Sequence, residues 1–116
     1  METIDFSAHA INRNWDPAGK VDLFRQMARI RRFEQEALKW YTAGKMGGWL
    51  ILDIGQESVA TSVRSLMGAR DHSISGPRGL GHALASGMEM GPCMAELHGK
   101  STGSSKGSSL RSTAAR

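Results

Sequence analysis

The sequence predicts a mostly helical chain with at most one short strand, and two observations support this. Apolar residues repeat at helical spacing from Pro17 to Gly44 and again from Gln56 to Gly68. Between these two regions, the run from Trp49 to Leu52 is continuously apolar but short, which suits either a short buried strand or an extended segment. With 116 residues, the chain can form one small domain or a piece of a larger one.

The first helix is predicted to begin at Asp16-Pro17. The Asp16 side chain can accept hydrogen bonds from free backbone N–H groups, and Pro17 suits the first helical position because it has no N–H to satisfy. The helix is predicted to end near Gly44, since glycine readily adopts the backbone conformation that follows many helices. Its apolar stripe contains Leu23, Met27, Ile30, Phe33, Ala37 and Tyr41, and is widened by Phe24, Leu38 and Trp40.

A second helix is predicted to begin at the corner formed by Gly55, Gln56 and Glu57, and to stop at Gly68. The start of a helix has unpaired N–H groups and a partial positive charge, which Glu57 would stabilise. Gln56 can either cap this helix or reach a ligand, and an ordinary helix start is the simpler interpretation. The apolar positions that indicate the helix are Val59, Ala60, Val63, Leu66 and Met67.

The glycine-rich stretch from Gly76 to His82 is predicted to be a loop. Its glycines would let the backbone approach a ligand closely, and Arg78 offers a planar fork of donors suited to phosphate or carboxylate. A plain surface loop is the commoner explanation for such a stretch. Two short helical pieces are expected after it, at residues 83–85 and 93–98, and Cys93 is expected to be a small core residue.

Composition limits the possible classes of protein. The net charge of +4 and the pI of about 9.7 suit an anionic partner. The single cysteine excludes an internal disulfide and a cysteine-based metal cage, and the four histidines show no metal-ligand spacing, so no metal site is predicted. No apolar run approaches the roughly 20 residues that span a bilayer, and the N-terminus lacks the character of a secretory signal. The protein is therefore expected to be soluble and cytoplasmic, without a membrane partner.

Four blocks of the sequence, in this order and spacing, resemble a known family. They are LFRQMARIRRFEQEALKWYTAGKMGGW, IGQESVATSV, DHSISGPRGLGHALASGM and CMAELHGKSTGSSKG. From about Leu23 to Gly107 the chain resembles the N-terminal part of the alpha subunits of thiamine-diphosphate-dependent 2-oxo acid dehydrogenases, and most closely the pyruvate dehydrogenase branch. The resemblance implies an α/β thiamine-diphosphate-binding fold. This chain would form only its mostly helical N-terminal portion, with the parallel sheet largely missing.

The same resemblance implies a function. The chain would be a truncated alpha subunit of a pyruvate dehydrogenase (acetyl-transferring), an oxidoreductase that decarboxylates pyruvate and passes the acetyl group to a lipoyl group. Its partners would be a beta subunit, in a heterotetramer, and the lipoyl acyltransferase core. Residues 1–15 would be a lead segment, residues 16–100 the N-terminal part of the alpha-subunit domain, and residues 101–116 a flexible Ser/Gly/basic tail. The chain by itself is expected to be inactive.

The family implies thiamine diphosphate and Mg²⁺ as cofactors, and the residues expected to bind the former are Arg78, Gln56 and His82. Pro77 replaces the tyrosine that usually precedes the arginine, and Ile51 stands where the pyruvate branch has a histidine. No catalytic residue is expected here, because the family's activating glutamate belongs to the beta subunit. The family's Gly-Asp-Gly…Asn segment, which binds magnesium and the diphosphate, is absent from this sequence.

An alternative from a different class is a small basic module that binds nucleic acid or another anionic partner. The pI and the basic tail support this alternative. Against it, the sequence lacks aromatic residues interleaved with basic ones and has no recognised nucleic-acid-binding motif. Nucleic acid is therefore the less favoured partner.

Overall fold

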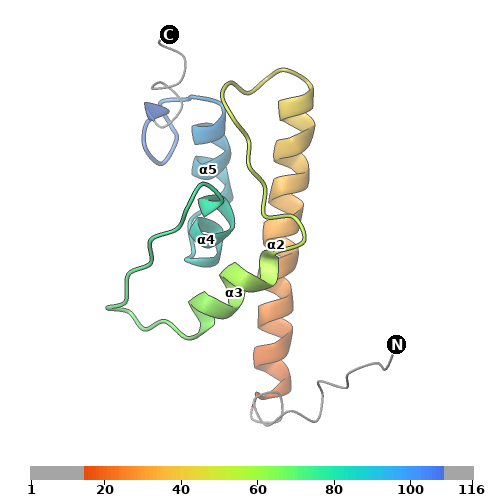
Figure 1. Cartoon of the computed structure of the whole chain (residues 1–116), viewed down its shortest axis with the longest axis vertical. Helices are drawn as coiled ribbons and strands as arrows, with labels where there is room; N and C mark the ends of the chain where they lie inside the picture. The colour runs from red at the N-terminus through yellow and green to blue at the C-terminus, as the bar shows by residue number, and fades with distance from the viewer. Residues whose placement is uncertain (1–14, 109–116) are drawn as a thin grey trace.

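The computed structural model describes residues 15–108, in which three shorter helices pack along one long helix (Figure 1). In chain order the helices are α2 (Pro17–Thr42), α3 (Glu57–Ser65), α4 (Gly79–Ala85) and α5 (Met90–Leu97). Residues 15–108 contain no strand, so the run from Trp49 to Leu52 is an extended segment. Within the same residues, no helix combines the length and the hydrophobicity needed to cross a membrane. The helical arrangement agrees with the predicted, mostly helical portion of the fold.

The long helix α2 begins and ends where the sequence predicts. Asp16 is its N-cap, and the Asp16 Oδ1 atom accepts a hydrogen bond from the N–H of Gly19 at 2.6 Å. Pro17 occupies the first helical position. After the last turn, Gly44 adopts a φ of 69°, a left-handed conformation that favours glycine and turns the chain out of the helix.

The hydrophobic core is small and lies along the middle of α2. Only the centre of the predicted stripe is buried, since Phe24 remains 68% exposed and Tyr41 is exposed as well. Cys93 is a core residue, as predicted, and burial raises the pKa of its thiol. The core consists of Ile30, Phe33, Ala37, Met46, Ala60, Leu84 and Cys93.

The helix α3 forms where predicted, but most of its apolar side chains are exposed. Val59 is 55% exposed and Leu66 is 82% exposed. The opposite, more polar edge packs against α2, because Glu57 forms an ion pair with Arg31 of that helix. The apolar positions therefore predict the helix correctly, but most of them do not face the core. The buried residues of α3 are Glu57, Ala60 and Thr61.

The helix α4 begins inside the stretch that the sequence predicts as a loop. Residues 76–78 are irregular, but Gly79 already belongs to the helix. Both short helical pieces predicted after the loop exist, and each starts earlier than expected, at Gly79 and at Met90. The sequence underestimates α4 because an N–H group in its first turn donates a hydrogen bond to a residue that is far away in the chain, as shown below.

Residues 100–108 form turns that fold back against α5. The N–H groups of Ser105 and Gly107 each donate a hydrogen bond to Oε2 of Glu96 at 2.9 Å. A Cβ atom added at Gly103 would lie 2.6 Å from the Glu96 Cα atom, so the close approach requires glycine. The described part of the predicted tail is thus held to α5 by Glu96. Residues 1–14 of the predicted lead segment and residues 109–116 of the tail lie outside the described residues.

Candidate functional site

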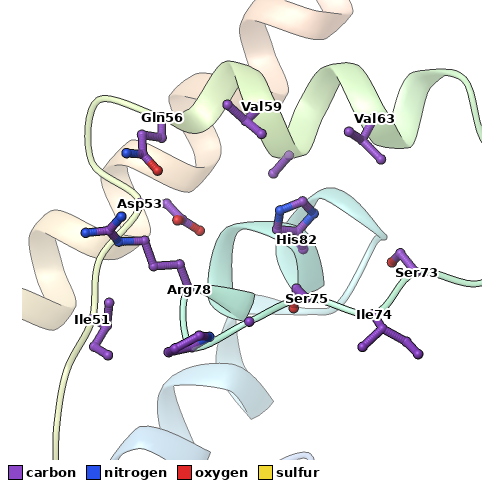
Figure 2. A pocket seen from close by; sticks show the side chains of 13 residues that line it. Ile51, Asp53, Gln56, Val59, Val63, Ser73, Ile74, Ser75, Arg78 and His82 are labelled. Atoms are coloured by element: carbon purple, nitrogen blue, oxygen red, sulfur yellow. The ribbon is translucent and has the colours of Figure 1, made fainter.

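An open cleft of about 700 Å³ separates α3 from the segment that leads into α4 (Figure 2). One wall consists of the end of the extended segment and the exposed face of α3, and the other consists of residues 73–78 and His82. The structure brings together all three residues expected to bind a cofactor, because Gln56, Arg78 and His82 all line this cleft. They come from two segments that are more than twenty residues apart in the sequence.

The cleft has a polar end and an apolar side. Figure 2 shows the Arg78 side chain reaching toward the end of the cleft where Gln56 and Asp53 lie, while His82 projects from α4 into the centre. Gln56 is the N-cap residue of α3 but its side chain makes no capping hydrogen bond. Arg78 is exposed, so its guanidinium group is accessible to a ligand. The apolar side is formed by Ile51, Val59, Val63 and Ile74.

The corner that precedes α3 is fixed from behind by α2. The Glu57 carboxylate pairs with the Arg31 guanidinium, with 3.0 Å between Nη2 and Oε2, and also accepts the N–H of Gly55 at 3.1 Å. The hydrogen bond from Arg31 lowers the pKa of Glu57 to about 2 and raises the pKa of Arg31. Gly55 has a φ of 91°, which makes the turn possible. Glu57 therefore positions the corner and does not face the cleft.

A buried carboxylate network, which the sequence did not predict, connects the two walls of the cleft. Glu34 of α2 is completely buried, and both of its oxygens accept the N–H of Asp53 at 2.9 Å. The Oδ2 atom of Asp53 accepts the N–H of Gly81 in α4, also at 2.9 Å. Burial raises the pKa of Glu34, although the hydrogen bond from Asp53 opposes this rise. Asp53 is only 5% exposed and lines the cleft.

A weak sequence signal does exist for Glu34. It lies four residues after Ile30 and beside Phe33, and therefore on the buried face of the first helix. A carboxylate in an apolar stripe requires a hydrogen-bonding partner, because burying an unpaired charge is costly. The sequence gives no indication that this partner is the backbone of Asp53, nineteen residues later.

The far end of α4 is also held by α2. The guanidinium group of Arg29 donates one hydrogen bond to the carbonyl oxygen of Leu84 at 3.1 Å and another to that of Met88 at 2.7 Å. The Leu84 oxygen lies in the last turn of α4, where a helix leaves carbonyl groups without partners, and the Met88 oxygen lies in the connection to α5. Through Arg29 at this end and Glu34 behind Asp53 at the other, α2 sets the position of the helix that carries His82.

The side chains of the cleft suit an anionic ligand that also has an apolar part. Arg78 can donate parallel hydrogen bonds to phosphate oxygens, and the amide of Gln56 and the ring of His82 can donate further ones. The apolar side offers surface for a ring or an alkyl group. In residues 15–108 there is no group of three or more His, Cys, Asp or Glu side chains placed to hold a metal ion.

Comparison with known proteins identifies one family. The profile of the family described as "Dehydrogenase E1 component" matches residues 25–116. Among curated relatives, the chain is 44% identical over 84 residues to the pyruvate dehydrogenase E1 component subunit alpha of Rhizobium meliloti, covering 72% of this chain and 24% of that protein. The subunit of the same name from Rickettsia prowazekii is 39% identical over 87 residues, covering 75% of this chain and 27% of its own length.

A third relative has the same name and a similar match. The pyruvate dehydrogenase E1 component subunit alpha of Zymomonas mobilis is 41% identical over 88 residues, covering 75% of this chain and 25% of that protein. The chain thus spans about a quarter of the length of the curated relatives it matches. No solved structure matches the chain at a significant level.

Proposed function

The chain belongs to the dehydrogenase E1 component family, and from this premise we propose that it acts as part of a pyruvate dehydrogenase-type alpha subunit. The curated relatives described above all have the name of that subunit. The reaction proposed for the assembled enzyme is the oxidative decarboxylation of pyruvate with transfer of the acetyl group to a lipoyl group. Its proposed partners are a beta subunit, in a heterotetramer, and the lipoyl acyltransferase core.

Within that assembly, the cleft is proposed to bind thiamine diphosphate. The observation that supports this most is the convergence of Gln56, Arg78 and His82, which the family resemblance selected independently, on the lining of one cleft. The donors present fit the diphosphate, and the apolar side fits the uncharged part of the cofactor. When bound, thiamine diphosphate supplies the carbanion-stabilising chemistry of decarboxylation. The residues of this chain bind and orient it.

Arg78 is proposed as the main anion ligand that this chain contributes. A guanidinium group presents a rigid fork of donors that matches two phosphate oxygens, and its charge shortens and strengthens those bonds. The preceding Pro77 offers neither a hydroxyl nor a backbone N–H, so of these two neighbouring residues only Arg78 can donate to the anion. Gln56 is proposed to bind from the opposite wall, and His82 from the centre of the cleft. No magnesium ligand is assigned to this chain.

The binding of inorganic pyrophosphate, measured by isothermal titration calorimetry on the full chain, tests this proposal. Arg78→Ala should weaken binding by roughly 10- to 100-fold, because hydrogen bonds from a charged group are lost. Arg70→Ala is the matched control, since Arg70 is exposed in the same connection but does not line the cleft. Equal losses of pyrophosphate affinity in the two variants, or no binding by the unaltered chain, would contradict the proposal.

The basic binding module described as the alternative is not favoured. It rests on the overall charge and the basic tail, whereas the family match extends over most of the chain. The pyrophosphate experiment also separates the two functions. A basic module binds anions through many exposed side chains, so single substitutions should have similar and small effects on affinity. Binding in the cleft should instead depend mainly on Arg78.

A further inference from the structure

We propose that Asp53 is a positioning residue that holds the two walls of the cleft at a fixed separation, with Glu34 as its anchor. The inference rests on the proposed function, since it concerns the same cleft. Asp53 is not expected to act on a substrate. Its role is to determine where Arg78 and His82 lie relative to Gln56, and therefore whether all three can bind one ligand.

All three hydrogen-bonding groups of Asp53 are used, and each one reaches a different part of the site. Its N–H donates to the Glu34 carboxylate of α2 at 2.9 Å. Its carbonyl oxygen accepts the N–H of Gln56, on one wall, at 2.7 Å. Its Oδ2 atom accepts the N–H of Gly81, in the helix of the other wall, at 2.9 Å. Asp53 is thus a single residue that contacts α2 and both walls.

The bond to Gly81 replaces a missing local cap. Arg78 is the N-cap residue of α4, but its side chain makes no capping hydrogen bond, and the first N–H groups of a helix have no partner within the helix. Gly81 is buried, so its N–H cannot be satisfied by bulk water. Because Asp53 provides the acceptor, the helix can begin directly after Arg78, and this keeps the arginine at the polar end of the cleft.

The contact between Asp53 and Gly81 leaves no space for adjustment. A Cβ atom added at Gly81 would lie 3.2 Å from the Asp53 Cγ atom and closer still to its Oδ2 atom. The carboxylate cannot retreat easily, because the backbone of Asp53 is held by Glu34 behind it. The distance between the two walls is therefore set by one fixed side chain, that of Asp53.

Asp53→Ala and Asp53→Asn in the full chain separate this role from general stabilisation. Asparagine keeps an oxygen that can accept the N–H of Gly81, whereas alanine does not. Asp53→Ala should speed amide hydrogen exchange at Gly81 by about tenfold or more and weaken pyrophosphate binding about tenfold. Asp53→Asn should stay within about twofold of the unaltered chain in both measurements. Should Asp53→Ala fail to fold by circular dichroism, Asp53→Val, which also lacks an acceptor, takes its place.

Asp16→Ala is the matched control. Asp16 also accepts the N–H of a glycine in the first turn of a helix, but it lies outside the cleft. It should change neither the exchange at Gly81 nor the binding of pyrophosphate. The proposal is overturned if Asp53→Ala leaves amide exchange at Gly81 unchanged, or if it speeds exchange equally throughout α2 and α5. It is also overturned if Asp53→Asn shows the same exchange at Gly81 and the same pyrophosphate affinity as Asp53→Ala. If the unaltered chain does not bind pyrophosphate, the proposed function fails, while exchange at Gly81 still decides the role of Asp53.

Discussion

The starts of α2 and α4 use the same bond in two different ways. In each helix a carboxylate accepts the N–H of a glycine at the third helical position, from Gly19 to Asp16 at 2.6 Å and from Gly81 to Asp53 at 2.9 Å. Asp16 lies three residues before its glycine and is exposed, whereas Asp53 lies 28 residues before its glycine and is buried. The same type of hydrogen bond therefore caps the start of α2 from a neighbouring residue, and at the start of α4 it joins two segments that are distant in the sequence.

The difference in burial gives the two caps different roles. An exposed cap can be replaced by water, so its loss typically costs about 1 kcal/mol and affects only the first turn of the helix. A buried cap is harder to replace, because removing it leaves the N–H of the buried Gly81 without its acceptor. We therefore expect substitutions at the start of α2 to be tolerated. Substitutions at the start of α4 should alter the arrangement of the whole cleft.

The largest effect is expected from Glu34→Ala, which removes the anchor of the buried cap. The substitution leaves the N–H of Asp53 without its acceptor and creates a cavity beside α2, and it should lower the free energy of unfolding by about 2–4 kcal/mol. Urea denaturation measures the change. Glu36→Ala is the matched control, because Glu36 lies on the same helix but forms only an exposed pair with Lys39 at 3.5 Å. A loss in Glu36→Ala as large as that in Glu34→Ala would contradict the comparison.

The second effect compares the two glycines directly. Gly81→Ala should lower the free energy of unfolding by about 1–3 kcal/mol, because the new methyl group meets the immobile Asp53 carboxylate. In Gly19→Ala the methyl group would lie 2.8 Å from the Asp16 Oδ1 atom. That side chain is exposed and can move, so the change should stay within about 1 kcal/mol in either direction. Thermal or urea unfolding of both variants measures these changes. Equal losses of unfolding free energy in the two variants would show that the two caps are equally rigid.

The smallest effect concerns the start of α3, which lacks a side-chain cap and depends on the pair between Glu57 and Arg31. The pKa of Glu57 is lowered from 4.5 to about 2 in the folded chain. The unfolded chain therefore binds this proton at higher pH, so the pair stabilises the fold above about pH 4.5 and its contribution is lost as the pH falls toward 2. The half-exposed Arg31 limits the size of the effect.

Comparison of the unaltered chain with Glu57→Gln measures this contribution. The difference between their free energies of unfolding should be greatest near neutral pH and should shrink as the pH is lowered through that window. A difference that does not depend on pH would mean that the ion pair does not hold the corner before α3.

The candidate site was predictable as far as it depends on residue types within short motifs. Arg78, Gln56 and His82 were selected from the sequence, and the structure places all three on one cleft. Asp53 and Glu34 were not selected, because the partners that explain their burial are distant in the sequence. The roles of all five residues in binding are proposals that the experiments above test.

The sequence by itself determined the limits of α2, the existence of the three shorter helices and the burial of Cys93, because caps, glycine stops and apolar periodicity act over a few neighbouring residues. The tertiary structure decided which face of α3 is buried and where α4 begins. Those choices depend on the bonds from Arg31 to Glu57 and from Gly81 to Asp53. A hydrogen bond between distant residues forms only when packing brings its partners within about 3 Å, and no local pattern specifies that distance.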